Sequence, residues 1–491
     1  MKYFSTRDKN NRVTAAQAIA QGLASDGGLF VPETIPAVSL SEIEALCRMD
    51  YRERAAVIMG RYLDEFTRDE LSAFVSEAYA DNYDSEEIAP TRFLHKNTAV
   101  LELWHGPTCA FKDMALQMLP RLLTASLKKL GERRKVCILV ATSGDTGKAA
   151  LEGFADVEDT SVVVFYPLDG VSDVQKLQMM TQHGKNVFVS AVEGNFDDAQ
   201  TGVKKIFGDR DFAKTLDEKG VFLSSANSIN WGRLLPQIVY YFSAYCDYVG
   251  SGKIAMGDEI DFCVPTGNFG DILAGWFAKK MGLPVRKLIC ASNSNNVLTD
   301  FINTGVYDRN REFFTTISPS MDILVSSNLE RLLFMFSDDV SVKGWMEDLR
   351  AKGRYDVGAE VLSKIQADFE AGFSSDDEAK AYIRELFKST GYLMDTHTAV
   401  AYSVLANMTR IGEEFPTVIV STASPYKFSD SVLDALGESS ALSGAGLIGK
   451  LEDVTGTKAP VPLTGLDART VRFTGCTPKE DMAEVVLRFL S

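Results

Sequence analysis

The chain has 491 residues, of which 45% are hydrophobic and 24% are charged, as in a globular protein of roughly two to four domains. Its 51 basic and 67 acidic side chains give a net charge of −16, which argues against a nucleic-acid groove as the main surface but allows a local pocket for a small anion. The seven scattered cysteines form no CxxC pair, the four histidines have no ligand spacing, and no apolar run approaches the roughly 18 residues of a membrane span, so we expect no disulfide framework, metal site or membrane segment.

Residues 1–95 are predicted to be mostly helical, because apolar residues recur at three- and four-residue steps over 39–63 and 67–80. Between them and the N-terminus, the glycines and proline of "GLASDGGLFVPE" (22–33) exclude a helix and predict an ordered loop, or a turn with a short strand. The polar start, "MKYFSTRDKNNRV", lacks the apolar core of a secretory signal. Together with the scattered cysteines it favours a cytoplasmic protein.

Short strand-like runs alternate with helical patterns over the middle of the chain. The runs are almost continuously apolar, as in strands buried on both faces of a parallel sheet, and they lie at 135–142, 160–167, 186–193, 220–225, 260–266, 285–292 and 416–422. The alternation indicates βαβ units, and the clustering of the runs in 135–225 and 260–422 predicts two sheet domains. The charged stretch 338–390 is predicted to be a solvated helical insertion.

Two glycine-rich loops, "SGDTG" (143–147) and "TGNFGD" (266–271), each follow a predicted strand and precede a predicted helix. A helix N-terminus offers free N–H groups, and glycine lets the backbone close around a ligand, so both loops can hold an anion. Neither has the P-loop or dinucleotide pattern. Each alone is equally well explained as a tight turn, but two loops in separate domains favour a small ligand in a cleft. Asp271 is expected to cap backbone N–H groups.

Lys112, in "HGPTCAFKD" (105–113), is a candidate nucleophile. A predicted helix over 114–130 and the apolar Ala110 and Phe111 are both expected to lower its pKa, and an unprotonated lysine attacks carbonyls. The alternative is a solvated lysine at a helix entry. After the run at 416–422, the hydroxyl of Ser421 or Thr422 would bond a ring nitrogen or simply cap a turn. These parts together suit pyridoxal phosphate, which brings an aldehyde, a phosphate and a ring nitrogen.

The motifs of this chain resemble those of threonine synthases of the class found in fungi and many bacteria. They are "GLASDGGLFVPE", "HGPTCAFKDMALQ", "SGDTG", "NSINWGRLLPQ", "PTGNFGD" and "TASPYKF", in the family's order along the whole chain. The resemblance implies an α/β fold of the tryptophan-synthase-β-like (fold type II) pyridoxal-phosphate enzymes, with two parallel-type sheet domains plus a helical N-terminal domain. The implied units are 1–95 (N-terminal, mostly helical), 96–134 with 226–491 (large, cofactor-binding, with the insertion at about 338–390) and 135–225 (small, mobile α/β).

The resemblance also implies the site residues. Lys112 would be the catalytic residue and form the Schiff base with pyridoxal 5'-phosphate, and Thr422 would bond the pyridine nitrogen. The cofactor's phosphate would lie on Gly267, Asn268, Phe269, Gly270 and Asp271. The substrate's carboxylate would lie on Ser143, Gly144 and Thr146, and its phosphate near Asn227, Ser228 and Arg233. Asp145 stands where other members of the fold type carry the Asn that meets the cofactor's 3′ oxygen.

The family converts O-phospho-L-homoserine and water into L-threonine and phosphate by β,γ-elimination and replacement, the last step of threonine biosynthesis. The resemblance thus implies a pyridoxal-phosphate-dependent carbon–oxygen lyase, monomeric and cytoplasmic, with a small-molecule substrate and no nucleic-acid or membrane partner. Two alternatives stay open: another lyase or dehydratase of this fold, making 2-oxobutyrate or acting on serine or threonine, and a non-catalytic ligand-binding relative. His105 is expected to pack and bond locally, and His397 to sit at a helix start, with facing the cleft as the alternative. The segment "SSNLERLLF" (326–334) resembles a family segment near the active site, but Asn328 and Arg331 are equally explained as surface residues of a helix entry.

Overall fold

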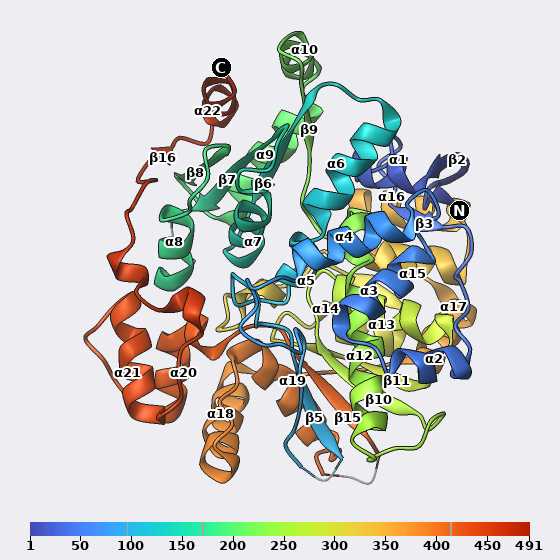
Figure 1. Cartoon of the computed structure of the whole chain (residues 1–491), viewed down its shortest axis with the longest axis vertical. Coiled ribbons are helices and arrows are strands. Elements are labelled where there is room, and N and C mark those ends of the chain that lie inside the picture. The colour runs from blue at the N-terminus through green and yellow to red at the C-terminus, as the bar shows by residue number, and fades with distance from the viewer. Residues whose placement is uncertain (96, 169–170, 413–414) are drawn as a thin grey trace.

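The computed structural model describes residues 1–95, 97–168, 171–412 and 415–491, and it contains two large, mainly parallel β-sheets (Figure 1). The larger sheet has six strands in the order β14-β11-β10-β15-β5-β4. Its strands are β4 (Thr91–Phe93), β5 (Thr98–Glu102), β10 (Ile260–Pro265), β11 (Val285–Ser292), β14 (Phe369–Phe373) and β15 (Thr417–Ser421). β4, at one edge, runs antiparallel to β5, and the other pairs are parallel.

The smaller sheet has five parallel strands in the order β16-β8-β7-β6-β9. They are β6 (Lys135–Ala141), β7 (Thr160–Pro167), β8 (Val187–Val192), β9 (Val221–Ser224) and β16 (Cys476–Thr477). The strands expected from the apolar runs in both sheets are therefore confirmed. The C-terminal β16 pairs with β8, although the sequence places 226–491 in the larger unit. The division into three units stays a prediction, and residue 96, at its first boundary, lies outside the described residues.

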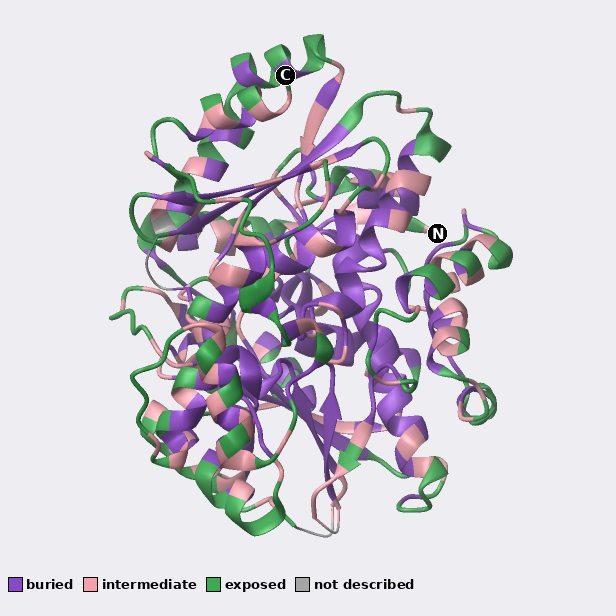
Figure 2. Cartoon of the chain, turned by 60° about the vertical axis from the view of Figure 1, so that its left-hand side comes forward, coloured by how far each residue is buried: buried purple, intermediate pink, exposed green. Residues whose placement is uncertain are grey.

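Both sheets are covered by helices on their two faces. Successive residues of a strand point to opposite sides, and because nearly all of them are apolar, both faces have to be shielded from water. In the smaller sheet, Val136, Ile138 and Val140 pack with α7 (Asp145–Phe154) and α8 (Asp173–Met180). Cys137 and Leu139 pack with α9 (Phe196–Gly208), α10 (Arg210–Glu218) and α22 (Met482–Phe489). Figure 2 shows the resulting pattern, with buried residues along the central strands and exposed residues on the outer helices.

The larger sheet is sandwiched in the same way. One face packs on α12 (Gln237–Gly250) and α13 (Gly270–Met281), and the other on α18 (Asp376–Thr390), α19 (Thr396–Asn407) and α20 (Ser429–Leu436). At its edge, β14 pairs with β11, so the stretch 338–390 is not only a solvated helical insertion: it supplies a strand and buried side chains. The short run "FEAGF" was missed because charged helical patterns flank it on both sides.

The N-terminal region combines helices with a three-stranded antiparallel sheet. The strands are β1 (Lys2–Ser5), β2 (Asp8–Thr14) and β3 (Phe30–Pro32), and the helices are α1 (Ala15–Gln21), α2 (Leu40–Leu46), α3 (Tyr51–Gly60) and α4 (Arg68–Ala78). Helices within 39–63 and 67–80 and a short strand within 22–33 are as predicted, but the first stretch is divided into α2 and α3, and the region is less helical than expected. β2 was missed because its polar, largely exposed residues carry no apolar alternation, and β1 was missed because it has only four residues.

The remaining elements connect these layers. They are α5 (Asp113–Leu116), α6 (Leu119–Leu130), α11 (Trp231–Leu234), α14 (Val297–Thr304), β12 (Val306–Asp308), η1 (Pro319–Met321), α15 (Leu329–Phe336), α16 (Asp339–Lys352), β13 (Arg354–Asp356), α17 (Gly358–Asp368), η2 (Pro425–Phe428), α21 (Ala445–Thr455), η3 (Val461–Leu463) and η4 (Leu466–Ala468). Among the described residues, no helix has the length and apolarity needed to cross a membrane.

The segment that follows β5 is anchored by His105. Its Nδ1 lies 2.5 Å from Asp84 Oδ1 and its Nε2 lies 3.1 Å from Glu102 Oε2. Burial alone would lower the pKa of His105, but the two carboxylates raise it to about 9. His105 is thus a local structural residue, as the sequence predicts, and it holds the start of the segment that leads to Lys112.

Replacing His105 with Gln removes this charge. Because its pKa is raised from 6.5 to about 9, the charge stabilises the fold fully below pH 6.5, and this contribution is lost as the pH rises through 9. We expect His105→Gln to lower the free energy of unfolding by about 1–3 kcal/mol near pH 6 and by much less near pH 10, measured by urea denaturation. An equal loss at both pH values would show that packing, not charge, is responsible.

Candidate active site

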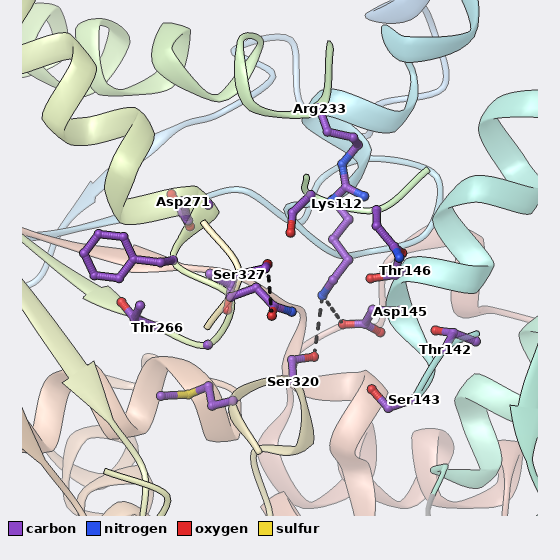
Figure 3. A pocket seen from close by; sticks show the side chains of 18 of the residues that line it. Lys112, Thr142, Ser143, Asp145, Thr146, Arg233, Thr266, Asp271, Ser320 and Ser327 are labelled. Atoms are coloured by element: carbon purple, nitrogen blue, oxygen red, sulfur yellow. Dashed lines mark hydrogen bonds and ion pairs between the residues drawn. The ribbon is translucent and has the colours of Figure 1, made fainter. Parts of the chain in front are cut away.

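A cavity of about 360 Å³ opens where strands of both sheets end, beyond β6, β10 and β15. The carboxyl ends of parallel strands are where α/β proteins bind ligands. The walls of the cavity include every site residue predicted from the sequence except Gly144. Figure 3 labels Lys112, Ser143, Asp145, Thr146, Arg233 and Asp271. The others are Asn227, Ser228, Gly267, Asn268, Phe269, Gly270 and Thr422. The structure therefore brings together motifs that lie far apart in the sequence.

Gly144 lies at the tight turn of the 143–147 loop, packed against α8. Its φ of +137° favours glycine, and a Cβ there would lie 2.5 Å from the Gln175 side chain of α8. Ser143 and Thr146, on either side of the tight turn, line the cavity next to the start of α7.

Lys112 reaches into the cavity with its ammonium group nearly buried. Its Nζ lies 3.4 Å from Asp145 Oδ2, 3.5 Å from Ser320 Oγ and 4.7 Å from the centre of the Phe111 ring (Figure 3). Its pKa is lowered, as predicted, but chiefly by burial, with Asp145 opposing the shift. The helix behind Lys112 is the single turn α5, and the predicted helix over 114–130 is divided into α5 and α6.

Asp145 is shared by two lysines. The Nζ of Lys427 lies 2.6 Å from its Oδ1, closer than Lys112, and Gln175 Nε2 donates to the same oxygen at 2.7 Å. Burial would raise the pKa of Asp145, but Lys427 and Lys112 hold it well below its ordinary value, so the carboxylate is ionised. Lys427 is fully buried and was not predicted, although it lies within the motif "TASPYKF".

The loop at 266–271 is held tightly against its surroundings. Phe269 has a left-handed backbone, φ 62°, which turns the chain directly into the N-terminus of α13. A Cβ on Gly267 would lie 2.6 Å from the carbonyl oxygen of Ser320. Asn328 donates its backbone N–H and its Nδ2 to the carbonyl oxygen of Asn268, both at 3.0 Å. The glycine-rich turn and the free N–H groups of α13 therefore form a rigid edge of the cavity.

The prediction that Asp271 caps backbone N–H groups is wrong. Its carboxylate instead accepts hydrogen bonds from the hydroxyls of Tyr240, at 2.5 Å, and Tyr241, at 2.8 Å. These tyrosines are on α12, which packs against α13, so a tertiary contact replaces the local cap. Burial raises the pKa of Asp271 to about 6 despite both hydrogen bonds.

Arg233 is a buried cation at the opposite side of Lys112 from Asp145 (Figure 3). Its Nη1 donates to the carbonyl oxygen of Ala226 at 2.6 Å, and its Nε has no hydrogen-bond partner. Among the residues that the structure describes, no carboxylate forms an ion pair with it. Burial lowers its pKa to about 10, and a buried guanidinium without an acidic partner is suited to an external anion.

Asn328 and Arg331 are not surface residues of a helix entry, as the sequence suggested, but are fully buried. Asn328 Nδ2 donates to Ser228 Oγ at 3.0 Å. Arg331 donates to the carbonyl oxygens of Phe30, at 2.9 Å, and Ile229, at 2.5 Å. These two residues connect the N-terminal region and α15 to the loop that carries Asn227 and Ser228.

His397 also contributes to the cavity wall. It lies in the first turn of α19, as expected from the sequence, with Nδ1 2.8 Å from Asp395 Oδ2. Its Nε2 accepts the backbone N–H of Ser320 at 3.2 Å. Other lining residues that sequence reasoning missed are Phe196, Gln200 and Lys204, which repeat at four-residue steps on α9. Of the two candidate hydroxyls, Thr422 lines the cavity, whereas Ser421 accepts from Trp104 Nε1 at 3.1 Å.

Taken together, the walls fit a phosphate-bearing aldehyde with a nitrogen-containing ring. Lys112 supplies a nucleophile of lowered pKa, the 266–271 turn supplies the free N–H groups at the start of α13, and Thr422 supplies a neutral hydroxyl. Arg233, buried with no hydrogen-bond partner for its Nε among the described residues, is suited to a second anion.

Three family models match the chain. "Threonine synthase N terminus" matches residues 2–79, "Pyridoxal-phosphate dependent enzyme" matches 95–423, and "Threonine synthase, C-terminal" matches 398–486. Human threonine synthase-like 1 is 43% identical over 454 residues, which cover 88% of this chain but only 60% of the human protein. Threonine synthase of Pseudomonas aeruginosa is 40% identical over 446 residues, covering 90% of this chain and 92% of its own.

Solved structures agree with these matches. The structure of pyridoxal-phosphate-bound threonine synthase from Brucella melitensis is 37% identical, with a TM-score of 0.88, and covers 100% of this chain and 98% of its own. Yeast threonine synthase is 34% identical, with a TM-score of 0.89 and the same coverage.

Proposed function

Because the chain belongs to the threonine synthase family of pyridoxal-phosphate-dependent enzymes, we propose that it converts O-phospho-L-homoserine and water into L-threonine and phosphate. The observation that carries this proposal is the presence of two separate anion positions beside Lys112. One is the turn at 266–271 and the other is the buried, unpaired Arg233 with Asn227 and Ser228. The cofactor's phosphate requires one of them, so the second is available for a substrate that carries its own phosphate.

Pyridoxal phosphate is the cofactor, and the cavity residues suit it. Lys112 would bind its aldehyde carbon, the turn 267–271 with the N-terminus of α13 would bind its phosphate, and Thr422 would bond its ring nitrogen. Asp145, adjacent to Lys112, would meet the 3′ oxygen. When bound, the cofactor withdraws electrons from the substrate and makes the protons near the amino group acidic.

The residues of the chain would then position the substrate and move its protons. The hydroxyls of Ser143 and Thr146, with the N-terminus of α7, would bind the carboxylate. Lys112, released from the cofactor, would take the proton from Cα, because burial lowers its pKa and so favours the basic amine. Arg233, Asn227 and Ser228 would hold the phosphate as it leaves Cγ and accumulates charge. We further propose that the small unit, 135–225, closes over the substrate and admits the one water that adds at Cβ.

The two anion positions also distinguish this reaction from the alternative functions. A serine or threonine dehydratase has no use for a second phosphate position, so Arg233 disfavours it. A lyase that forms 2-oxobutyrate from phosphohomoserine would use the same contacts, and only the product distinguishes it. A non-catalytic relative would not require Lys112 at lowered pKa. A small-molecule substrate, a monomeric state and a cytoplasmic location complete the proposal.

The first test is the covalent link between Lys112 and the cofactor. The purified protein with pyridoxal phosphate is expected to absorb visible light and, after borohydride reduction, to gain the mass of the reduced cofactor. Lys112→Ala should lose both signals, because it removes the amine that reaches into the cavity beside Asp145 and Ser320. Lys204→Ala, which removes a lysine from the same cavity wall, is the control and should keep both. Reduction that labels Lys112→Ala equally well would refute the assignment.

The second test is the product. Incubation with O-phospho-L-homoserine should release phosphate and L-threonine in equal amounts, measured by a phosphate assay and by chromatography. Phosphate with 2-oxobutyrate would identify the lyase alternative, and no phosphate release would favour the non-catalytic one.

Arg233→Met should lower kcat/KM about 10- to 100-fold, because charged hydrogen bonds to the phosphate are lost. Arg384→Met, which removes a hydrogen bond to the Ala435 carbonyl away from the cavity, should leave kcat/KM unchanged.

A further inference from the structure

Lys427 is a buried cation that the proposed mechanism does not use. It lies in η2, just beyond β15, and its side chain is 0% exposed. Its Nζ lies 2.6 Å from Asp145 Oδ1 and donates to the carbonyl oxygen of Thr108 at 2.9 Å. Its own carbonyl oxygen accepts from Ser172 Oγ at 3.2 Å. Lys427 therefore connects the larger-sheet side of the cavity to α7 and α8 of the smaller sheet.

Asp145 creates a problem that Lys427 can solve. A buried carboxylate 3.4 Å from Lys112 Nζ stabilises the ammonium form of that lysine, and an ammonium ion neither attacks an aldehyde nor accepts a proton. The other charged groups around Lys112 are Arg233 on α11, Asp271 on α13 and Lys427 on η2. Of these, only Lys427 touches Asp145 directly, and it is closer to the carboxylate than Lys112 is.

We propose that Lys427 is a positioning residue that neutralises Asp145, so that Asp145 contacts Lys112 without holding it as an ammonium ion. Together, Asp145 and Lys427 carry no net charge, so Lys112 faces an electrically neutral pair rather than a lone carboxylate. The inference rests on the proposed cofactor chemistry of Lys112 but not on which product is formed.

The test is a pH titration of the visible absorbance of the protein with bound pyridoxal phosphate, because this absorbance changes when the Lys112 nitrogen gains or loses its proton. Lys427→Met removes the cation that offsets Asp145, so the midpoint of the absorbance titration is expected to move to higher pH. The double variant Asp145→Asn with Lys427→Met removes both charges, and its midpoint should return towards that of the wild type. Such a reversal distinguishes charge compensation from a merely structural role.

Lys148→Met is the matched control. Lys148 is also buried and paired, with Nζ 2.7 Å from Glu152 on the same helix α7, but it does not line the cavity. Its loss should leave the midpoint unchanged. A midpoint that stays the same or falls in Lys427→Met, or one that does not return in the double variant, would overturn the proposal.

Failure of the single variant to hold the cofactor is also informative. If Lys427→Met loses the cofactor and the double variant regains it, the charge pairing is supported. If the double variant fails as well, Lys427 acts through packing and the proposal is wrong. Because the readout is spectroscopic, an enzyme that formed 2-oxobutyrate would still give a valid result, whereas a wild-type protein without visible absorbance would refute the proposed function itself.

Discussion

The cavity depends on one carboxylate held between two buried lysines. Ionised groups in a protein interior are costly unless they are paired, and Asp145 satisfies Lys427 and contacts Lys112 with its two oxygens. The pair joins residues from both sheets, so the electrostatic requirement also fixes how the sheets face each other at the cavity. The low polarity that makes this pairing necessary is also what lowers the pKa of Lys112.

Around this centre, backbone contacts rather than further charges set the geometry. The turn at 266–271 is pressed against the Ser320 carbonyl, and the N–H of Ser320 is in turn held by His397. Arg331 donates only to neutral oxygens, one of them the carbonyl of Phe30 in the N-terminal sheet. The N-terminal region thereby supports the loop of Asn227 and Ser228 across a distance of some two hundred residues in sequence.

The sequence predicted those parts of the fold that have a strong local pattern. Almost continuous apolar runs identified the central strands, and Lys112, Arg233 and the glycine-rich turns were found because motif order placed them in one site. The residues and strands that were not predicted from the sequence depend on tertiary contacts. Lys427, Asn328 and Arg331 read as ordinary polar residues until folding buries them. Asp271 has the spacing of a helix cap, but its carboxylate accepts hydrogen bonds from two tyrosines of α12 instead of from backbone N–H groups. β14 is hidden between charged helical patterns, and β16, with two residues, is too short for any periodicity to show.

The pairing of β16 with β8 changes how the smaller sheet is attached to the rest of the molecule. The chain enters this sheet after α6, leaves it before α11, and returns at β16, so three covalent connections cross between the two bodies. A sheet unit connected to the rest of the chain by three segments can move as a rigid unit in fewer ways than one connected by two segments. One of these tethers, residues 225–230, includes Asn227 and Ser228. Ligand occupancy and the stiffness of the tether are therefore thermodynamically linked, because both involve the same few backbone torsions.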